Sequence, residues 1–136
     1  MSGAATELPP GAELLGREWV GFDSTGETAL IRYQARPSFT NRHGSIQGGF
    51  LAAMLDDCMG PALWLMTKGE FFPATIAMTV CFLDSAAPGP LFGEGQVVRY
   101  GNTIAFLEGR LSNGSGRLLA RATANARMVP AKRAVA

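Results

Sequence analysis

The alternation of apolar and polar residues predicts two short strands followed by one long helix. Trp19–Asp23 and Thr28–Ala35 are aromatic and β-branched runs separated by Ser24–Gly26, a pattern typical of a hairpin. In Gly48–Met66, all but two of the nineteen residues are apolar or small, and the run is long enough for about four to five helical turns. We therefore expect a largely buried helix after the hairpin.

The hydrophobic period falls to two after Lys68–Gly69, which predicts four more strands. Three of them are strand-length runs separated by turn residues: Thr75–Leu83, Leu91–Tyr100 and Thr103–Ser112. In the fourth, Arg117–Met128, the even positions are apolar and the odd positions are mostly polar. We give this alternation more weight than the helical propensity of its alanines. The four strands are expected to follow one another in a meander.

The predicted fold class is α+β, with the long helix at the centre. A helix that is apolar on nearly every side needs cover around most of its circumference, and a curved antiparallel sheet of five to six strands provides it. Small residues and one leucine share a helix face where another backbone can approach closely: Gly49, Ala52, Ala53, Asp56, Gly60 and Leu63. A chain of 136 residues is expected to hold one domain, at 17–129, between a flexible arm at 1–16 and a flexible tail at 130–136.

The composition indicates an oligomer and argues against two classes of partner. Only 17% of the residues are charged and 47% are hydrophobic, so part of the surface must be apolar, which favours a homo-oligomer. A net charge of +1 argues against nucleic-acid binding. Asp56, Asp57 and Pro61 argue against a membrane span in the apolar helix. The first residues lack the basic and apolar regions of a signal peptide, so a cytoplasmic location is expected.

The predicted helix start, Gln47, Gly48 and Gly49, is a candidate oxyanion site. The first backbone N–H groups of a helix have no partner within the helix and carry partial positive charge, and glycine lets a substrate approach closely. The competing interpretation is that the glycines only allow a sharp turn from loop to helix.

Asp56 and Asp57 form a carboxylate pair in the middle of the most apolar segment. A carboxylate there is costly unless it is paired, hydrogen-bonded or used in chemistry. Asp56 lies on the small-residue face, about 12 Å along the helix from Gly48. The alternative is that one aspartate points to solvent or a cap and the other forms a salt bridge at a subunit contact.

The remaining reactive side chains give little support to other chemistries. His43, the single histidine, lies in a polar loop and pairs with no plausible Ser or Cys nucleophile, which argues against a catalytic triad. Cys58 and Cys81 fit no metal spacing and are expected to be small core residues. We expect neither a metal nor a cofactor.

Residues Asn41–Gly49 (NRHGSIQGG), continued by Leu55 and Asp56, resemble the signature of the hotdog-fold acyl-CoA thioesterases of the phenylacetate-pathway PaaI type. That signature runs from an Asn through a Gly to His-Gly-Gly at the helix start, and then to an Asp seven residues after the second Gly. The strand pattern of the family also matches, so the similarity covers about 17–129. The resemblance implies a hotdog fold, in which a curved sheet wraps a central helix, and hydrolysis of an acyl- or aryl-CoA thioester.

The resemblance also assigns roles to residues. It implies that Asp56 is the general base or nucleophile, that the Gly48 N–H binds the thioester carbonyl, and that Asn41 orients water or substrate. Thr75 falls where relatives often carry Ser or Thr beside the nucleophile, and we include Thr75, Gly49 and His43 as candidate substrate-binding residues. Gln47 stands where the family has His, and glutamine donates a hydrogen bond without exchanging protons near neutral pH.

Partners and alternatives follow from the same resemblance. In the family two subunits pair so that the Asp of one faces the Asn–Gly loop and helix start of the other, which implies a homodimer or a tetramer of two such dimers. Gln47 keeps open a second hypothesis, a hotdog module that binds acyl-CoA without hydrolysing it. A hydratase of the same fold is disfavoured, because no histidine follows Asp56.

Overall fold

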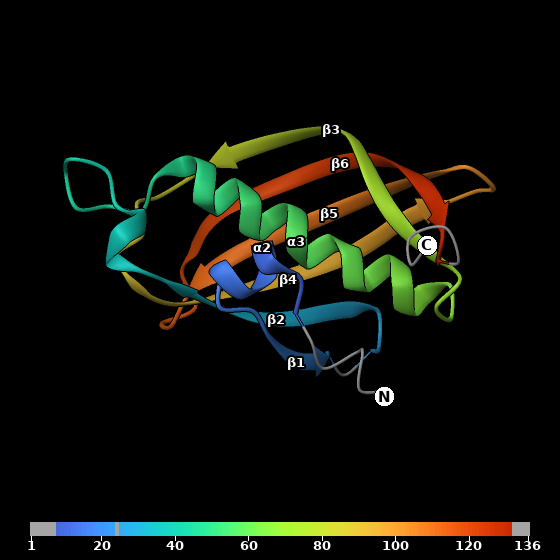
Figure 1. The fold of residues 1–136 in the computed structure, drawn as a ribbon, viewed down its shortest axis with the longest axis horizontal. Coiled ribbons are helices and arrows are strands. Elements are labelled where there is room, and N and C mark those ends of the chain that lie inside the picture. Colours follow the sequence, from blue (N-terminus) through green and yellow to red (C-terminus); the bar gives the residue numbers. More distant parts are fainter. Residues whose placement is uncertain (1–7, 24, 132–136) are drawn as a thin grey trace.

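A long helix lies in the concave face of a six-stranded antiparallel sheet (Figure 1). The computed structural model describes residues 8–23 and 25–131. In chain order the elements are α2 (Pro10–Leu14), β1 (Glu18–Phe22), β2 (Thr28–Ala35), η1 (Pro37–Phe39), α3 (Gly48–Met66), β3 (Phe71–Phe82), β4 (Gly89–Tyr100), β5 (Ile104–Asn113) and β6 (Leu118–Pro130). The predicted α+β fold with a wrapped central helix is confirmed.

The strand order is β1-β2-β4-β5-β6-β3, so the predicted meander is wrong in one step. The strands β4, β5 and β6 are consecutive neighbours, but β3 pairs with β6 at the far edge and β4 pairs with β2. The connection 83–88 crosses between these two places, and its Ala86 oxygen accepts a hydrogen bond from the Ile46 N–H just before α3. Hydrophobic alternation marks each strand but carries no information about its neighbours, which is why the crossover was not predicted.

The helix bounds match the prediction, and the strand bounds differ mainly at β3, which starts four residues early. Pro73 hid this extension, because proline cannot donate a hydrogen bond to a sheet, but an edge strand tolerates it. In β6 the even positions from Ala120 onward face the core as predicted, whereas at its start Leu119 is buried in place of Leu118. A register shift in the β5–β6 pairing, between Leu111 and Ser112, accounts for that change of side.

The helix packs on the sheet through glycines of the strands. Gly95 on β4 and Gly109 on β5 are directly paired, and both face Cys58 in the middle of α3. A Cβ atom at Gly95 would lie 1.9 Å from the Cys58 carbonyl oxygen, so only glycine allows the helix to lie this close. Cys58 is fully buried as predicted, but Cys81 is exposed, because it pairs with Arg121 on the outer face of the sheet.

The small-residue face of α3 is largely accessible, with one correction. Gly49, Ala53 and Asp56 are exposed, whereas Leu63, predicted on the same face, is fully buried. The strand β3 begins beside the last turns of the helix, where Pro73 lies against Gly60, and it covers the face there.

The described part of the predicted flexible arm is packed on the domain. Ala12 in α2 and the following Leu15 are buried, and the Leu15 oxygen accepts a hydrogen bond from the Gln34 N–H on β2. The packed region therefore begins before residue 17, while residues 1–7 of the arm and 132–136 of the tail lie outside the described residues. No helix in the described ranges is both long and apolar enough to cross a membrane.

Candidate active site

The start of α3 presents two backbone donors. The first backbone hydrogen bonds at this end run from the Phe50 and Leu51 N–H groups to the Gln47 oxygen, and within the described chain the Gly48 and Gly49 N–H groups have no acceptor. No atom lies within 4 Å of the position that a Cβ would take at Gly49, so the approach on that side is open. A carbonyl oxygen could therefore bind at this helix end.

The loop before α3 is held by Asn41. The Asn41 side-chain oxygen accepts hydrogen bonds from the His43 N–H (2.9 Å) and the Ser45 N–H (3.2 Å). His43 is exposed in this turn, and Gln47 is exposed at the helix cap without a side-chain capping bond. The Asn41 side-chain oxygen thus holds the loop, and the NH2 group of the same side chain could donate a hydrogen bond to a substrate or water.

Asp56 lies on the exposed face of α3 beside the edge strand. The Thr75 hydroxyl donates a 2.7 Å hydrogen bond to Asp56 Oδ1. A β-bulge between Thr75 and Ala77 leaves Ile76 60% exposed, and it turns Thr75 toward the helix. One carboxylate oxygen is thereby fixed and the other remains accessible, which suits a base or a nucleophile.

Asp57 points away from β3, toward β2, and both of its carboxylate oxygens have partners within the chain. The Tyr33 hydroxyl donates to Asp57 Oδ2 at 2.7 Å, and Arg17 Nη1 lies 3.2 Å from Asp57 Oδ1. Burial raises the pKa of Tyr33 well above its ordinary value, and the nearby Cys58 and Asp57 raise it further. One of the two aspartates therefore has the salt bridge that the sequence suggested, but with Arg17 of the same chain rather than at a subunit contact.

Within one chain, Gly48 and Asp56 lie about 12 Å apart along the helix and cannot contact the same atom. The edge strand β3 passes both of them. Near its end the Phe82 ring lies 3.2 Å from the position that a Cβ would take at Gly48, and near its middle Thr75 binds Asp56. The candidate residues thus form two half-sites at two places along the same α3–β3 surface.

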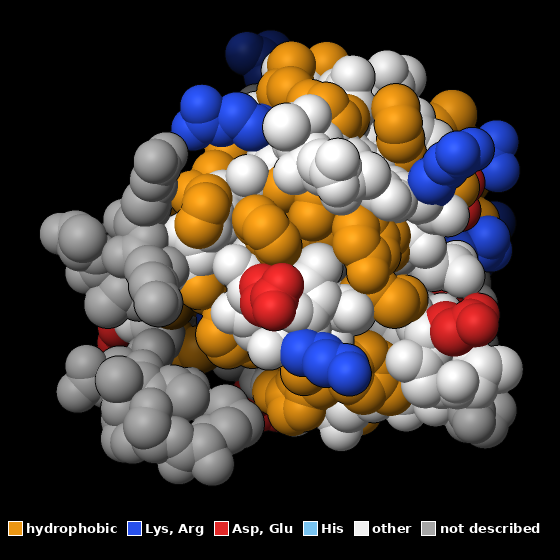
Figure 2. All heavy atoms as spheres, turned by 90° about the vertical axis from the view of Figure 1, so that its right-hand side faces the viewer, with side chains coloured by type: hydrophobic (Ala, Val, Ile, Leu, Met, Phe, Trp, Pro, Cys, Tyr) orange, Lys and Arg blue, Asp and Glu red, His pale blue; other side chains and the backbone are white. Residues whose placement is uncertain are grey.

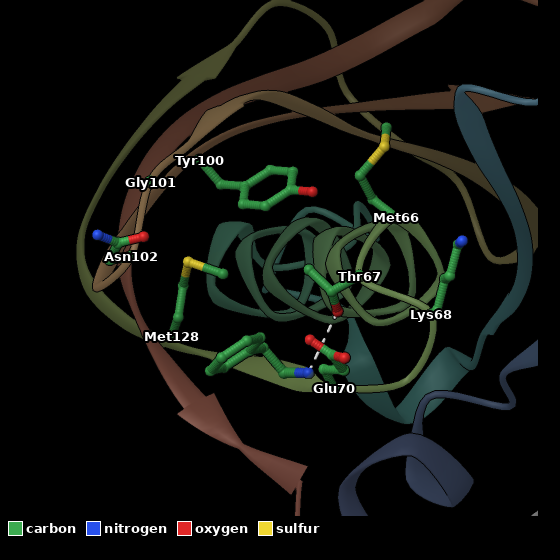
Figure 3. Close-up of a pocket in the computed structure, with 9 residues that line it drawn as sticks. Met66, Thr67, Lys68, Glu70, Tyr100, Gly101, Asn102 and Met128 are labelled. Atoms are coloured by element: carbon green, nitrogen blue, oxygen red, sulfur yellow. Dashed lines mark hydrogen bonds between the residues drawn. The ribbon is translucent and has the colours of Figure 1, made fainter.

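Two surface cavities lie at the other end of the helix. One of about 350 Å³ is lined by Met66, Lys68, Tyr100 and neighbouring residues (Figure 3). The second, of about 240 Å³, shares Met66 and Lys68 with it. Figure 2 shows this end of the molecule, where apolar side chains gather on the surface. Met66 is about 15 Å along the helix from Asp56, and neither cavity is lined by Gly48, Asp56 or Thr75.

The described residues contain no cluster of three or more His, Cys, Asp or Glu side chains suited to a metal ion. The most buried thiol, Cys58, contacts backbone oxygens of Leu55 and Glu94, and burial raises its pKa well above the ordinary value. This thiol therefore stays protonated and is no candidate nucleophile.

Sequence reasoning missed Arg17 and Tyr33, which bind Asp57. Tyr33 carried a weak signal, because it occupies an inward position of a predicted strand and a buried tyrosine hydroxyl usually needs a partner. Arg17 carried none, since it lies 40 residues before Asp57 in the chain.

Both a family profile and solved structures relate this chain to thioesterases. The sequence profile of the Thioesterase superfamily matches residues 43–120. A phenylacetic acid degradation-related protein of Ralstonia eutropha JMP134, described as a thioesterase, is 31% identical, with 91% of this chain and 92% of that chain covered and a TM-score of 0.82. A Streptococcus mutans UA159 protein solved with bound acetyl-CoA is 19% identical, with 84% and 89% covered and a TM-score of 0.72.

A curated relative from Saccharolobus solfataricus, named as an esterase, is 29% identical over 94 residues. The match covers 69% of this chain and 66% of the relative, so the chain spans slightly less than two thirds of that protein.

Proposed function

The chain belongs to the thioesterase superfamily, in its PaaI-like branch with the hotdog fold, and on that basis we propose that it hydrolyses an acyl- or aryl-CoA thioester to the free acid and CoA. The observation that carries the proposal is the carboxylate of Asp56, held by Thr75 on an accessible helix face beside the strand that also contacts Gly48. The CoA part of the substrate is further supported by the acetyl-CoA bound to the structurally similar Streptococcus protein.

In this proposal Asp56 activates water as a general base or attacks the thioester carbonyl itself. The Gly48 N–H binds the carbonyl oxygen as it becomes an oxyanion, and Gly49 leaves room for it. Assistance by Asp56 is expected to contribute about 10²–10⁴-fold and one oxyanion donor about 10²–10³-fold. In the proposal the NH2 groups of Asn41 and Gln47 bind substrate or water, and His43, which lies between them in the loop, is a candidate substrate contact.

The proposed site needs two copies of the chain. Among residues 8–23 and 25–131, no strand pairs with the outer edge of β3, and this strand exposes Thr75, Ile76 and Phe82. If two copies pair antiparallel through this edge around Met78–Thr79, Thr75 of one copy lies opposite Phe82 of the other. Because Thr75 contacts Asp56 and Phe82 contacts Gly48, such pairing would join each Asp56 to the other copy's Gly48. The homodimer is therefore part of the proposal; a tetramer of two dimers and a cytoplasmic location remain predictions.

Thiol release from a panel of phenylacetyl-, benzoyl- and straight-chain acyl-CoAs tests the activity. Asp56→Asn is expected to keep the fold and the oligomeric state and to lower the hydrolysis rate at least about a hundredfold. Near-full activity in that variant would remove Asp56 from the mechanism.

Subunit complementation tests the shared site. Gly48→Pro deletes the proposed donor at the first helical position, where proline fits the backbone, and Gly48→Ala, which adds a Cβ beside Phe82 but keeps the N–H, controls for crowding. Two chains with different tags, one with Asp56→Asn and one with Gly48→Pro, are co-expressed and the heterodimer is isolated. A site shared between copies leaves one of two sites intact, so about half of the wild-type activity returns; sites within single chains would leave none.

The alternative is a module that binds acyl-CoA without hydrolysing it. This hypothesis stays open because Gln47 stands where the family has histidine. Saturable binding of the same CoA panel without thiol release would favour it.

A further inference from the structure

Three consecutive residues in the middle of α3 bind three different parts of the sheet. Asp56 accepts from Thr75 on β3, and Asp57 accepts from Tyr33 on β2. Cys58 lies against the paired glycines Gly95 and Gly109 on β4 and β5. Because β2 and β3 lie toward opposite sides of the sheet, these contacts fix both the depth of the helix and its rotation about its own axis.

The Asp57 side chain has two partners, Tyr33 and Arg17, and both contacts are partly or fully shielded from solvent. Tyr33 is fully buried, and the side chains of Asp57 and Arg17 are only 21% and 23% exposed. Arg17 follows α2, so this ion pair also ties the N-terminal segment to the helix. Consecutive helical residues point about 100° apart, so the rotation that satisfies Asp57 also aims Asp56 at Thr75.

The same contacts control the charge next to Asp56. Without Arg17, the Asp57 carboxylate would be an uncompensated negative charge one residue from Asp56; with it, the pair is nearly neutral. Tyr33 on β2 and Cys58 on α3 are titratable groups beside Asp57, Glu94 on β4 acts on Cys58, and β3 contributes the non-ionising Thr75 hydroxyl.

From this geometry we infer that Arg17, Tyr33 and Asp57 are positioning residues that aim the Asp56 carboxylate and shield it from the charge of its neighbour. The inference rests on the proposed role of Asp56. Arg17, Tyr33 and Asp57 themselves are not expected to contact the substrate. It predicts that removing Arg17 and removing Asp57 displace the pH–activity profile in opposite directions.

The test compares Arg17→Gln, Asp57→Asn and the double variant. Arg17→Gln leaves a bare negative neighbour, so the acid limb of the pH–activity profile moves up by about half a pH unit. Asp57→Asn leaves a bare positive neighbour, and the limb moves down by a similar amount. The double variant returns close to wild type. Arg32→Gln is the matched control, because Arg32 forms an exposed ion pair with Glu18 away from the helix.

Aiming is tested by Tyr33→Phe, which keeps the ring and removes the hydroxyl. We expect kcat to fall about three- to tenfold with KM within about twofold. A titration of the Asp56 carboxyl carbon by NMR, assigned with Asp56→Asn, reports the same opposite shifts without needing turnover. If NMR finds the same pH response in Arg17→Gln, Asp57→Asn and the wild type, the inference is overturned. If NMR finds the opposite displacements but the protein releases no thiol, only the proposed hydrolysis is overturned.

Discussion

The close contact between α3 and β4 predicts that Gly95→Ala and Gly109→Ala, although chemically identical, change the free energy of unfolding by very different amounts. Gly95 and Gly109 are cross-strand partners, and both face Cys58. At Gly95 an added Cβ would lie 1.9 Å from the Cys58 oxygen and 2.7 Å from its carbonyl carbon, where real contacts are essentially never under 3.0 Å. At Gly109 the nearest atoms would be 3.4 Å away, an ordinary contact.

The magnitude follows from what has to move. The atoms in the way at Gly95 belong to the helix backbone, so no side-chain rotation relieves the clash and α3 must retreat by at least about 1 Å. Overpacking of this kind typically costs about 1–3 kcal/mol, and a backbone clash belongs at the upper end, so we expect about 3 kcal/mol for Gly95→Ala. Gly109→Ala gains only the lower entropy of the unfolded chain, about 0.4–1 kcal/mol of stabilisation.

Thermal unfolding followed by circular dichroism measures the difference. With about 2.1 cal/mol/K per residue, 3 kcal/mol in this chain corresponds to a Tm lower by about 10 °C for Gly95→Ala, whereas Gly109→Ala stays at or slightly above wild type. All proteins are compared at one chain concentration, because an oligomer's Tm depends on it. Equal Tm values for the two variants would refute the close packing of Cys58 on β4.

Three further outcomes follow from single contacts. Thr75→Val, which removes the hydrogen bond to Asp56, is expected to lower thiol release about tenfold, while Thr123→Val at an exposed position of β6 leaves the rate unchanged; equal rates would remove Thr75 from the site. A thiol reagent is expected to label Cys81 alone in the native protein and both cysteines in guanidinium, and rapid native labelling of Cys58 would contradict its burial. Burial raises the pKa of Cys58, so the native thiol keeps its proton where the unfolded one ionises. The unfolding free energy should therefore fall as the pH rises from about 8.5 to about 10, by up to about 1.4 kcal/mol per pH unit, and Cys58→Ala should remove that slope in denaturant titrations; above about 10 the raised pKa of Tyr33 adds a slope of its own.

The helix and most strand bounds could be predicted from the sequence, because they depend on residues close together in the chain. The bounds of α3 follow from a glycine pair at one end of a run that is apolar or small except for Asp56 and Asp57, and the alternation in β6 outweighed its alanine content. Strand neighbours were predicted less well, since the place of β3 beside β6 depends on a crossover that leaves no periodic trace.

For the candidate site, the residues came from spacing and resemblance, whereas their arrangement required the structure. The pairing of Asp57 with Tyr33 spans 24 positions of the chain, and the inward strand position of Tyr33 indicates that its hydroxyl needs a partner but not which one. The helix spacing predicted the separation of about 12 Å between Gly48 and Asp56, whereas their meeting across two subunits was implied by the resemblance alone. The bulge that aims Thr75 was unpredicted, because Ile76 reads as an ordinary strand residue.

The adjacency of Asp56, Asp57 and Cys58 limits how the gene can tolerate changes in length. One codon inserted between Gly48 and Asp56 would turn everything downstream by about 100° and misdirect all three side chains together. A codon added in the turns at 101–103 or 114–117 would only lengthen an exposed connection. Insertions and deletions in a library of this gene should therefore survive in the hairpin turns and be eliminated from the first half of the helix.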